Sequence, residues 1–213
     1  MVVSSLPGEG KTTCAVLLAI SLAALGRKIL FIEADLRKPA AGRYLHLDSG
    51  VPGLSDYLTG NAGLEEVSRQ GPVETLKVIT AGKEKAPANV SELLSSDRFR
   101  KLLEDADQMY DRVVIDVPPV LYIPDGLIIS KIVHTGVLVC GSGMVYRKTV
   151  KIIAEKFNAI HFAIIGAIIN RADYSKEHHY YNSYYSYYYP EYKKHRRRTW
   201  AGLQRRRPAD PVK

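Results

Sequence analysis

A glycine-containing segment near the start of the chain has residue types suited to holding a polyphosphate. Residues 5–13 read Ser-Leu-Pro-Gly-Glu-Gly-Lys-Thr-Thr and match G-x-x-x-x-G-K-[ST] except at the first position, where Ser5 replaces glycine. In such loops backbone N–H groups and a helix start surround the phosphates, the lysine reaches the β and γ phosphates, and the next hydroxyl binds magnesium. A glycine-rich turn before a core helix is the plain alternative. The pattern favours ATP and Mg²⁺ as cofactors, held by Pro7, Gly8, Glu9, Gly10, Lys11, Thr12 and Thr13.

Two further apolar segments end at acidic residues. Glu33 and Asp35 follow the segment 29–32, and Asp116 follows the segment 113–115. Parallel strands present their C-terminal ends at one edge of an open α/β sheet, where ligands bind. Each acid alone would more often be a helix cap or a solvated loop residue, but a phosphate loop at a matching strand end favours a shared site. Because magnesium prefers carboxylate, hydroxyl and water ligands, Asp116 and Thr12 are expected to hold the metal, with Asp35 as a second carboxylate candidate.

The C-terminal part of the chain is dominated by tyrosine. Nine tyrosines occur between residues 174 and 192, and hydrophobic periodicity stops after Asn170, so everything after about residue 174 is expected to be flexible. A low-complexity aromatic segment for adhesion or stacking is one interpretation. With an ATP site on the same chain, we prefer to interpret the cluster as phosphate acceptors, namely Tyr180, Tyr181, Tyr184, Tyr185, Tyr187, Tyr188, Tyr189 and Tyr192.

Transfer of phosphate to tyrosine benefits from a base, because the phenolic hydroxyl has a pKa of about 10. Glu33 or Asp35 is expected to act as that base, and Arg37 to steady phosphate oxygens. Together with Lys11, these residues form the predicted catalytic set.

The alternation of apolar patterns predicts one α/β domain with a mainly parallel sheet flanked by helices. Strands are expected at 1–4, 28–32, 75–80, 112–115, 137–140 and 163–169, and helices at 11–25, 54–58, 64–69, 91–109, 125–133 and 147–157. The first strand is short for a central one and is expected to begin upstream of Met1. The chain then divides into a P-loop domain at 1–173, the tyrosine cluster at 174–192 and a basic flexible tail at 193–213.

The net charge of +8 is confined to the end of the chain. Residues 193–213 contain nine Lys and Arg residues and one acid, which leaves 21 basic and 21 acidic residues in the remainder. The neutral body argues against nucleic acid as a partner, and the basic tail is more typical of a solvated or membrane-attracted segment. No apolar stretch is long enough to span a bilayer and no signal peptide is recognisable, so a cytoplasmic protein is expected.

Taken together, these segments resemble the bacterial tyrosine autokinases, often called BY-kinases, which control export of capsular and other extracellular polysaccharides. The resemblance covers nearly the whole chain: PGEGKTT (7–13), FIEADLRKP (31–39), VVIDVPPV (113–120), Asp125, GAIINR (166–171) and the tyrosine cluster. It implies that Lys11 and Thr12 bind phosphate and magnesium, that Asp116 helps hold the metal, and that the clustered tyrosines accept phosphate. In related nucleotide-binding folds an asparagine and an arginine after the last strand lie against adenine, and the corresponding residues here are Asn170 and Arg171.

The same resemblance implies several partners and a cellular place. It implies a membrane-embedded activator or chain-length regulator of polysaccharide export, either separate or fused upstream, and a homo-oligomer in which subunits phosphorylate one another. It also implies a cognate phosphotyrosine phosphatase and a position at the inner face of the plasma membrane. Two departures are visible: Glu33 stands where the family usually has aspartate, and the family's E-x-x-R-x-x-R oligomerisation motif is absent from the sequence.

Two other functions fit parts of the pattern. One is a MinD- or ParA-like ATPase switch, although those proteins carry an extra lysine at the place held here by Leu6 and lack a tyrosine tail. The other is a catalytically weak regulator of polysaccharide export that binds nucleotide without transferring phosphate. Mapping phosphate after incubation with ATP and magnesium distinguishes all three.

Overall fold

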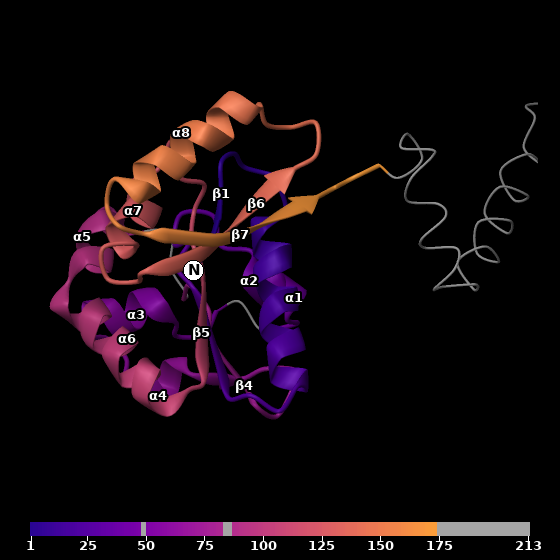
Figure 1. Ribbon diagram of the computed structural model, residues 1–213. Coiled ribbons are helices and arrows are strands. Elements are labelled where there is room, and N and C mark those ends of the chain that lie inside the picture. Colours follow the sequence, from indigo (N-terminus) through magenta and orange to yellow (C-terminus); the bar gives the residue numbers. More distant parts are fainter. Residues whose placement is uncertain (48–49, 83–86, 174–213) are drawn as a thin grey trace, which may run out of the picture. The chain divides into compact units, whose positions relative to one another are not determined.

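The computed structural model describes residues 1–47, 50–82 and 87–173, so the tyrosine cluster and the basic tail lie outside the described residues. Residues Met1–Arg171 form one compact unit. Within it, seven strands form a single sheet in the order β3-β4-β2-β5-β1-β6-β7 (Figure 1). The strands are β1 (Val2–Ser4), β2 (Ile29–Glu33), β3 (Arg69–Gln70), β4 (Leu76–Ile79), β5 (Arg112–Asp116), β6 (Thr135–Gly141) and β7 (Ala163–Asn170).

All strand pairs are parallel except the pair of β3 and β4. This confirms the predicted α/β fold with a mainly parallel sheet. The register places Glu33 opposite Asp116 where β2 and β5 end, and β1 lies between β5 and β6. The acid-bearing strand ends and the start of the phosphate loop therefore meet at one edge of the sheet, as the sequence predicted.

Helices cover both faces of the sheet (Figure 1). On one face α1 and α2 pack in a buried cluster with Ile29 and Phe31 of β2, and on the other face α3, α5, α6, α7 and α8 pack in a cluster with Leu30 and Ile32. Successive side chains of a strand point to opposite faces, which explains why this central strand is apolar without interruption. The helices are α1 (Lys11–Ala24), α2 (Ala41–Tyr44), α3 (Leu54–Thr59), α4 (Leu64–Val67), α5 (Val90–Ser95), α6 (Asp97–Met109), α7 (Asp125–Ile129) and α8 (Arg147–Asn158).

The long helix predicted at 91–109 is in fact two helices. The chain is extended at Ser96, where φ is −70° and ψ is 155°, and the Ser96 hydroxyl accepts a hydrogen bond from the Phe99 N–H at 3.3 Å. Serine is a favoured N-cap because its side chain satisfies an N–H group that the first turn leaves unpaired. The apolar spacing continues across the break, and for this reason hydrophobic periodicity alone predicted one helix.

Other boundaries differ where local signals were weak. The helix predicted at 64–69 ends at Val67, and the next residues form the two-residue strand β3, which the sequence did not predict. The short helix α2 was also missed, and α7 ends four residues before the predicted limit of 133. In the part of the chain that the structure describes, no helix is both long and apolar enough to cross a membrane.

Candidate functional site

The phosphate loop connects β1 to α1 and is held in shape by its own buried acid. The Glu9 carboxylate is fully buried and accepts hydrogen bonds from the Leu6 N–H at 2.6 Å and the Gly141 N–H at 3.0 Å. The Asn170 amide donates to the Glu9 carbonyl oxygen at 2.8 Å. The Glu9 side chain therefore fastens the loop to itself and to β6, so its contribution to a phosphate site comes from the backbone.

Gly10 is required by both conformation and space. It has a φ of +89°, and a Cβ atom there would lie 2.0 Å from the Asn170 Nδ2 atom. Residues other than glycine rarely adopt this φ, and a Cβ atom so close would displace the Asn170 amide that braces the loop. The loop can keep this path next to Asn170 only with glycine.

Gly10→Ala is expected to raise the dissociation constant for ADP at least about tenfold, because it strains the loop backbone at a φ of +89° and displaces the Asn170 amide that braces it. Titration with a fluorescent ADP analogue measures this constant. Gly26→Ala is the matched control, since Gly26 also has a positive φ, +81°, but no atom lies within 4 Å of its added Cβ. Equal affinity of Gly10→Ala and the wild type would contradict the assigned loop geometry.

Lys11, Thr12 and Asp116 come together beneath the loop. Asp116 is fully buried, Lys11 is 6% exposed, and the Lys11 ammonium forms an ion pair with Asp116 Oδ1. The Thr12 hydroxyl donates to Asp116 Oδ2 at 2.7 Å. A hydroxyl and a carboxylate in contact are the protein ligands that magnesium commonly uses beside a nucleotide, so these residues fit the metal. The described residues contain no cluster of three His, Cys, Asp or Glu side chains, and a nucleotide-bound magnesium does not need one.

The two acids after β2 have different surroundings. Asp35 is 7% exposed, lines the cavity beside the loop and accepts a hydrogen bond from the Lys38 N–H at 3.0 Å. Burial raises the pKa of Asp35 above its ordinary value. Asp35 therefore combines access to the cavity with a higher proton affinity than an exposed aspartate has.

The Glu33 carboxylate accepts hydrogen bonds from backbone N–H groups, and Glu33 is not among the residues lining the cavity. Its carboxylate accepts N–H groups from Ala40 at 2.5 Å, Ala41 at 2.6 Å and Ala81 at 3.1 Å. Burial raises its pKa as well. The structure does not support Glu33 as a base, because all three contacts fix the start of α2 and the end of β4.

Arg37 lines the cavity and is anchored from behind by a buried acid. Its Nε and Nη2 atoms donate to the Asp125 carboxylate at 2.8 and 3.2 Å, and Nη2 also donates to the Ser91 hydroxyl at 3.2 Å. Ser91 in turn donates to Asp125 Oδ1 at 2.7 Å. Sequence reasoning gave Ser91 no role, since the contact joins residues 54 positions apart.

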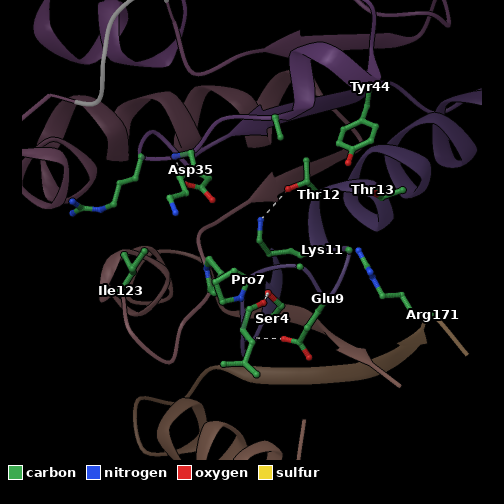
Figure 2. A pocket seen from close by; sticks show the side chains of 17 residues that line it. Ser4, Pro7, Glu9, Lys11, Thr12, Thr13, Asp35, Tyr44, Ile123 and Arg171 are labelled. Carbon is green, nitrogen blue, oxygen red and sulfur yellow. Dashed lines mark hydrogen bonds between the residues drawn. The ribbon is translucent and has the colours of Figure 1, made fainter. Parts of the chain in front are cut away.

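The cavity itself has a volume of about 390 Å³ and runs along the phosphate loop. Figure 2 shows Asp35 on one side of Thr12, and Tyr44 and Arg171 on the other. The predicted residues Pro7, Gly8, Glu9, Gly10, Lys11, Thr12, Thr13, Asp35, Arg37 and Arg171 all line it. Asn170 and Asp116 do not, because the first braces the loop and the second lies buried against Lys11. Sequence reasoning missed Tyr44, whose helix α2 has no periodic signal.

The sequence resembles bacterial proteins named tyrosine-protein kinases. Residues 2–138 match a family described as an AAA domain. The chain is 38% identical over 164 residues to the tyrosine-protein kinase ptk of Acinetobacter johnsonii, covering 77% of this chain and 22% of that protein. It is 35% identical over 180 residues to the tyrosine-protein kinase YwqD of Bacillus subtilis, covering 84% of this chain and 75% of that protein. The chain thus spans under a quarter of the first relative and three quarters of the second.

Solved structures agree with the sequence relatives. The kinase domain of the Escherichia coli tyrosine kinase ETK superposes with a TM-score of 0.76 at 35% identity, covering 81% of this chain and 67% of that one. The cell-division ATPase MinD of Pyrococcus furiosus superposes with a TM-score of 0.68 at 21% identity, covering 81% and 72%. The second likeness is one of fold alone.

Proposed function

This chain belongs to the bacterial tyrosine-protein kinases of the AAA-domain fold, and on that premise we propose that it transfers phosphate from ATP to tyrosines of its own C-terminal cluster. The observation that carries the proposal is the convergence of Lys11, Thr12 and Asp116 under a glycine-containing loop. The acceptors are Tyr180, Tyr181, Tyr184, Tyr185, Tyr187, Tyr188, Tyr189 and Tyr192.

The loop residues bind and orient the triphosphate. Backbone N–H groups from Gly8 to Thr13 surround the α and β phosphates, and the Lys11 ammonium leaves Asp116 to contact the β and γ phosphates. Thr12 and Asp116 would hold magnesium, which neutralises phosphate charge when it is bound. Asp35 is the second carboxylate within reach of the same cavity.

Asp35 is the proposed base. The tyrosine oxygen attacks the γ-phosphorus, the bond from that phosphorus to the β–γ bridging oxygen breaks, and ADP leaves. The phenolic proton passes to Asp35, whose raised pKa makes it a better acceptor than an ordinary aspartate. The Asp125 and Ser91 contacts engage Nε and Nη2 of Arg37, so we assign the contact with a γ-phosphate oxygen to Nη1.

We further propose the cellular setting that the resemblance to bacterial tyrosine autokinases implies. The kinase acts at the inner face of the plasma membrane with a membrane-embedded activator of polysaccharide export, either separate or fused upstream. Copies of the chain phosphorylate one another in a homo-oligomer, and a phosphotyrosine phosphatase reverses the reaction. Phosphorylation makes the cationic end of the chain neutral or anionic, because each phosphotyrosine adds about −1.5 to −2 charges.

The decisive experiment is incubation of the purified protein with ATP and magnesium, followed by mapping of phosphate by mass spectrometry. Label is expected between Tyr180 and Tyr192, and none in Lys11→Met. ADP release without phosphotyrosine would instead indicate an ATPase switch, and neither product would indicate a nucleotide-binding regulator. An upstream segment or activator is added in a parallel reaction, so that a silent protein is tested under activating conditions.

A further inference from the structure

Tyr44 is the only aromatic side chain among the described residues that line the cavity. It is the last residue of α2, and 52% of it is exposed. A half-exposed ring at the mouth of a cavity buries little surface in the protein itself. The exposed face of the ring is therefore available to contact a ligand that fills the cavity.

The backbone that carries Tyr44 belongs to an anchored helix. The Glu33 carboxylate accepts the N–H groups of Ala40 and Ala41 at the start of α2. Ala41 is fully buried in a cluster with Ala15 and Ala19 of α1, the helix that follows the phosphate loop. The backbone of Tyr44, about one turn later, is thus held near the loop, while its side chain is half exposed.

A triphosphate bound with its γ phosphate at the Asp35 side would have its nucleoside at the Tyr44 end. A phosphate-loop lysine contacts the β and γ phosphates, and in this cavity Asp35 lies on one side of the loop (Figure 2). The α phosphate and nucleoside must then leave on the other side, past Thr13. Figure 2 shows Tyr44 and Arg171 on that side, one from α2 and one directly after β7.

We propose that the Tyr44 ring stacks on the base of the bound nucleotide, with the Arg171 guanidinium at the same end of the cavity. Aromatic faces stack on bases regardless of base identity, and a guanidinium plane offers a second surface. The inference rests on the proposed ATP site, with the γ phosphate at the Asp35 side of the cavity, and its test measures binding without phosphoryl transfer. It makes Tyr44 a determinant of nucleoside affinity and leaves the phosphates to the loop.

Two probes separate base contacts from phosphate contacts. ADP and inorganic tripolyphosphate, each with magnesium, are titrated calorimetrically into the full chain and into Tyr44→Ala, Tyr44→Phe and Tyr146→Ala. Tyr44→Ala is expected to weaken ADP about five- to tenfold and to leave tripolyphosphate within about twofold of wild type. Tyr44→Phe keeps the ring and should bind ADP like the wild type. Tyr146 is 83% exposed and does not line the cavity, so Tyr146→Ala is the matched control.

Three results would overturn the stacking role. They are an unchanged ADP affinity in Tyr44→Ala, an equal loss for ADP and tripolyphosphate, and a loss in Tyr44→Phe as large as in Tyr44→Ala. Tripolyphosphate binding also shows that each variant is folded at the loop. If wild-type protein binds neither probe, the proposed nucleotide site itself fails, which is a different result from a Tyr44 that makes no difference.

Discussion

Asp116→Asn is expected to destabilise the nucleotide-free protein by about 3–5 kcal/mol, because it leaves the buried Lys11 ammonium without its carboxylate. Lys11→Met should cost a similar amount, since it leaves the Asp116 charge buried and unpaired. The double variant has neither charge and should be more stable than the sum of the two losses predicts. Urea unfolding of the four proteins measures the coupling.

Activity should follow a different pattern from stability. Both single variants and the double variant are expected to autophosphorylate at least about 100-fold more slowly than the wild type, because each lacks a phosphate or metal contact. A double variant that regains stability without activity separates the two roles of the pair. Comparing the four proteins also shows whether the absence of autophosphorylation in Lys11→Met results from a lost phosphate contact or from unfolding.

The exposed pair of Lys101 and Asp105 provides the matched control. These side chains lie 3.2 Å apart at i and i+4 on α6, with Lys101 70% exposed. Lys101→Met is expected to change stability by less than about 0.5 kcal/mol and to leave activity intact. If Lys11→Met were equally harmless to stability, the buried ion pair would not exist in solution.

Asp35→Asn is expected to lower the autophosphorylation rate about 100- to 10,000-fold with little loss of stability. Asparagine has nearly the same shape and retains an oxygen for the Lys38 N–H group. Glu33→Gln is expected to lower stability with little loss of the autophosphorylation rate. It replaces one oxygen that accepts backbone N–H groups by an amide NH2 group, which can only donate, and this costs about 1–3 kcal/mol of stability while the folded fraction stays active.

The pH dependence provides a second measure of the base. The ionised form of Asp35 accepts the proton, so kcat/KM falls as pH drops through its pKa in the free protein. Because burial raises that pKa, the midpoint should lie above the ordinary aspartate value of about 3.9. Glu33→Gln should keep this acid limb. A folded Glu33→Gln protein as inactive as Asp35→Asn would show that Glu33 takes part in the chemistry.

The sequence predicted the fold class and the meeting of the phosphate loop with acid-bearing strand ends, because both follow from local patterns. An apolar strand, a phosphate loop and a helix follow one another within the first 25 residues, and their order is visible in the chain. Strands that end at Asp116 or just before Asp35 bring these acids to one edge of the sheet when the strands are parallel. The boundaries of the helices were predicted less accurately, since the cap at Ser96 interrupts a helical pattern that continues on both sides.

The distinction between Glu33 and Asp35 could not be predicted in the same way. The two residues stand two positions apart at one strand end, so strand alternation places them on the same face. The two acids differ because segments as distant in the chain as Ala81 contact Glu33. The N–H groups of Ala40, Ala41 and Ala81 donate to its carboxylate, and Glu33 does not line the cavity. The anchoring of Arg37 by Asp125 joins residues 88 positions apart and is likewise invisible in the local sequence.

The phosphate loop, the acids at strand ends and the tyrosines on the same chain can be recognised from the sequence, because each depends on residue types at short spacing. The folded chain is needed to show which acid faces the cavity, which acid braces α2, and that Tyr44 lines the cavity on the side opposite Asp35. The physical reason is that burial and hydrogen-bond partners are set by segments that meet through packing of the sheet and its helices. The local sequence does not specify those tertiary contacts.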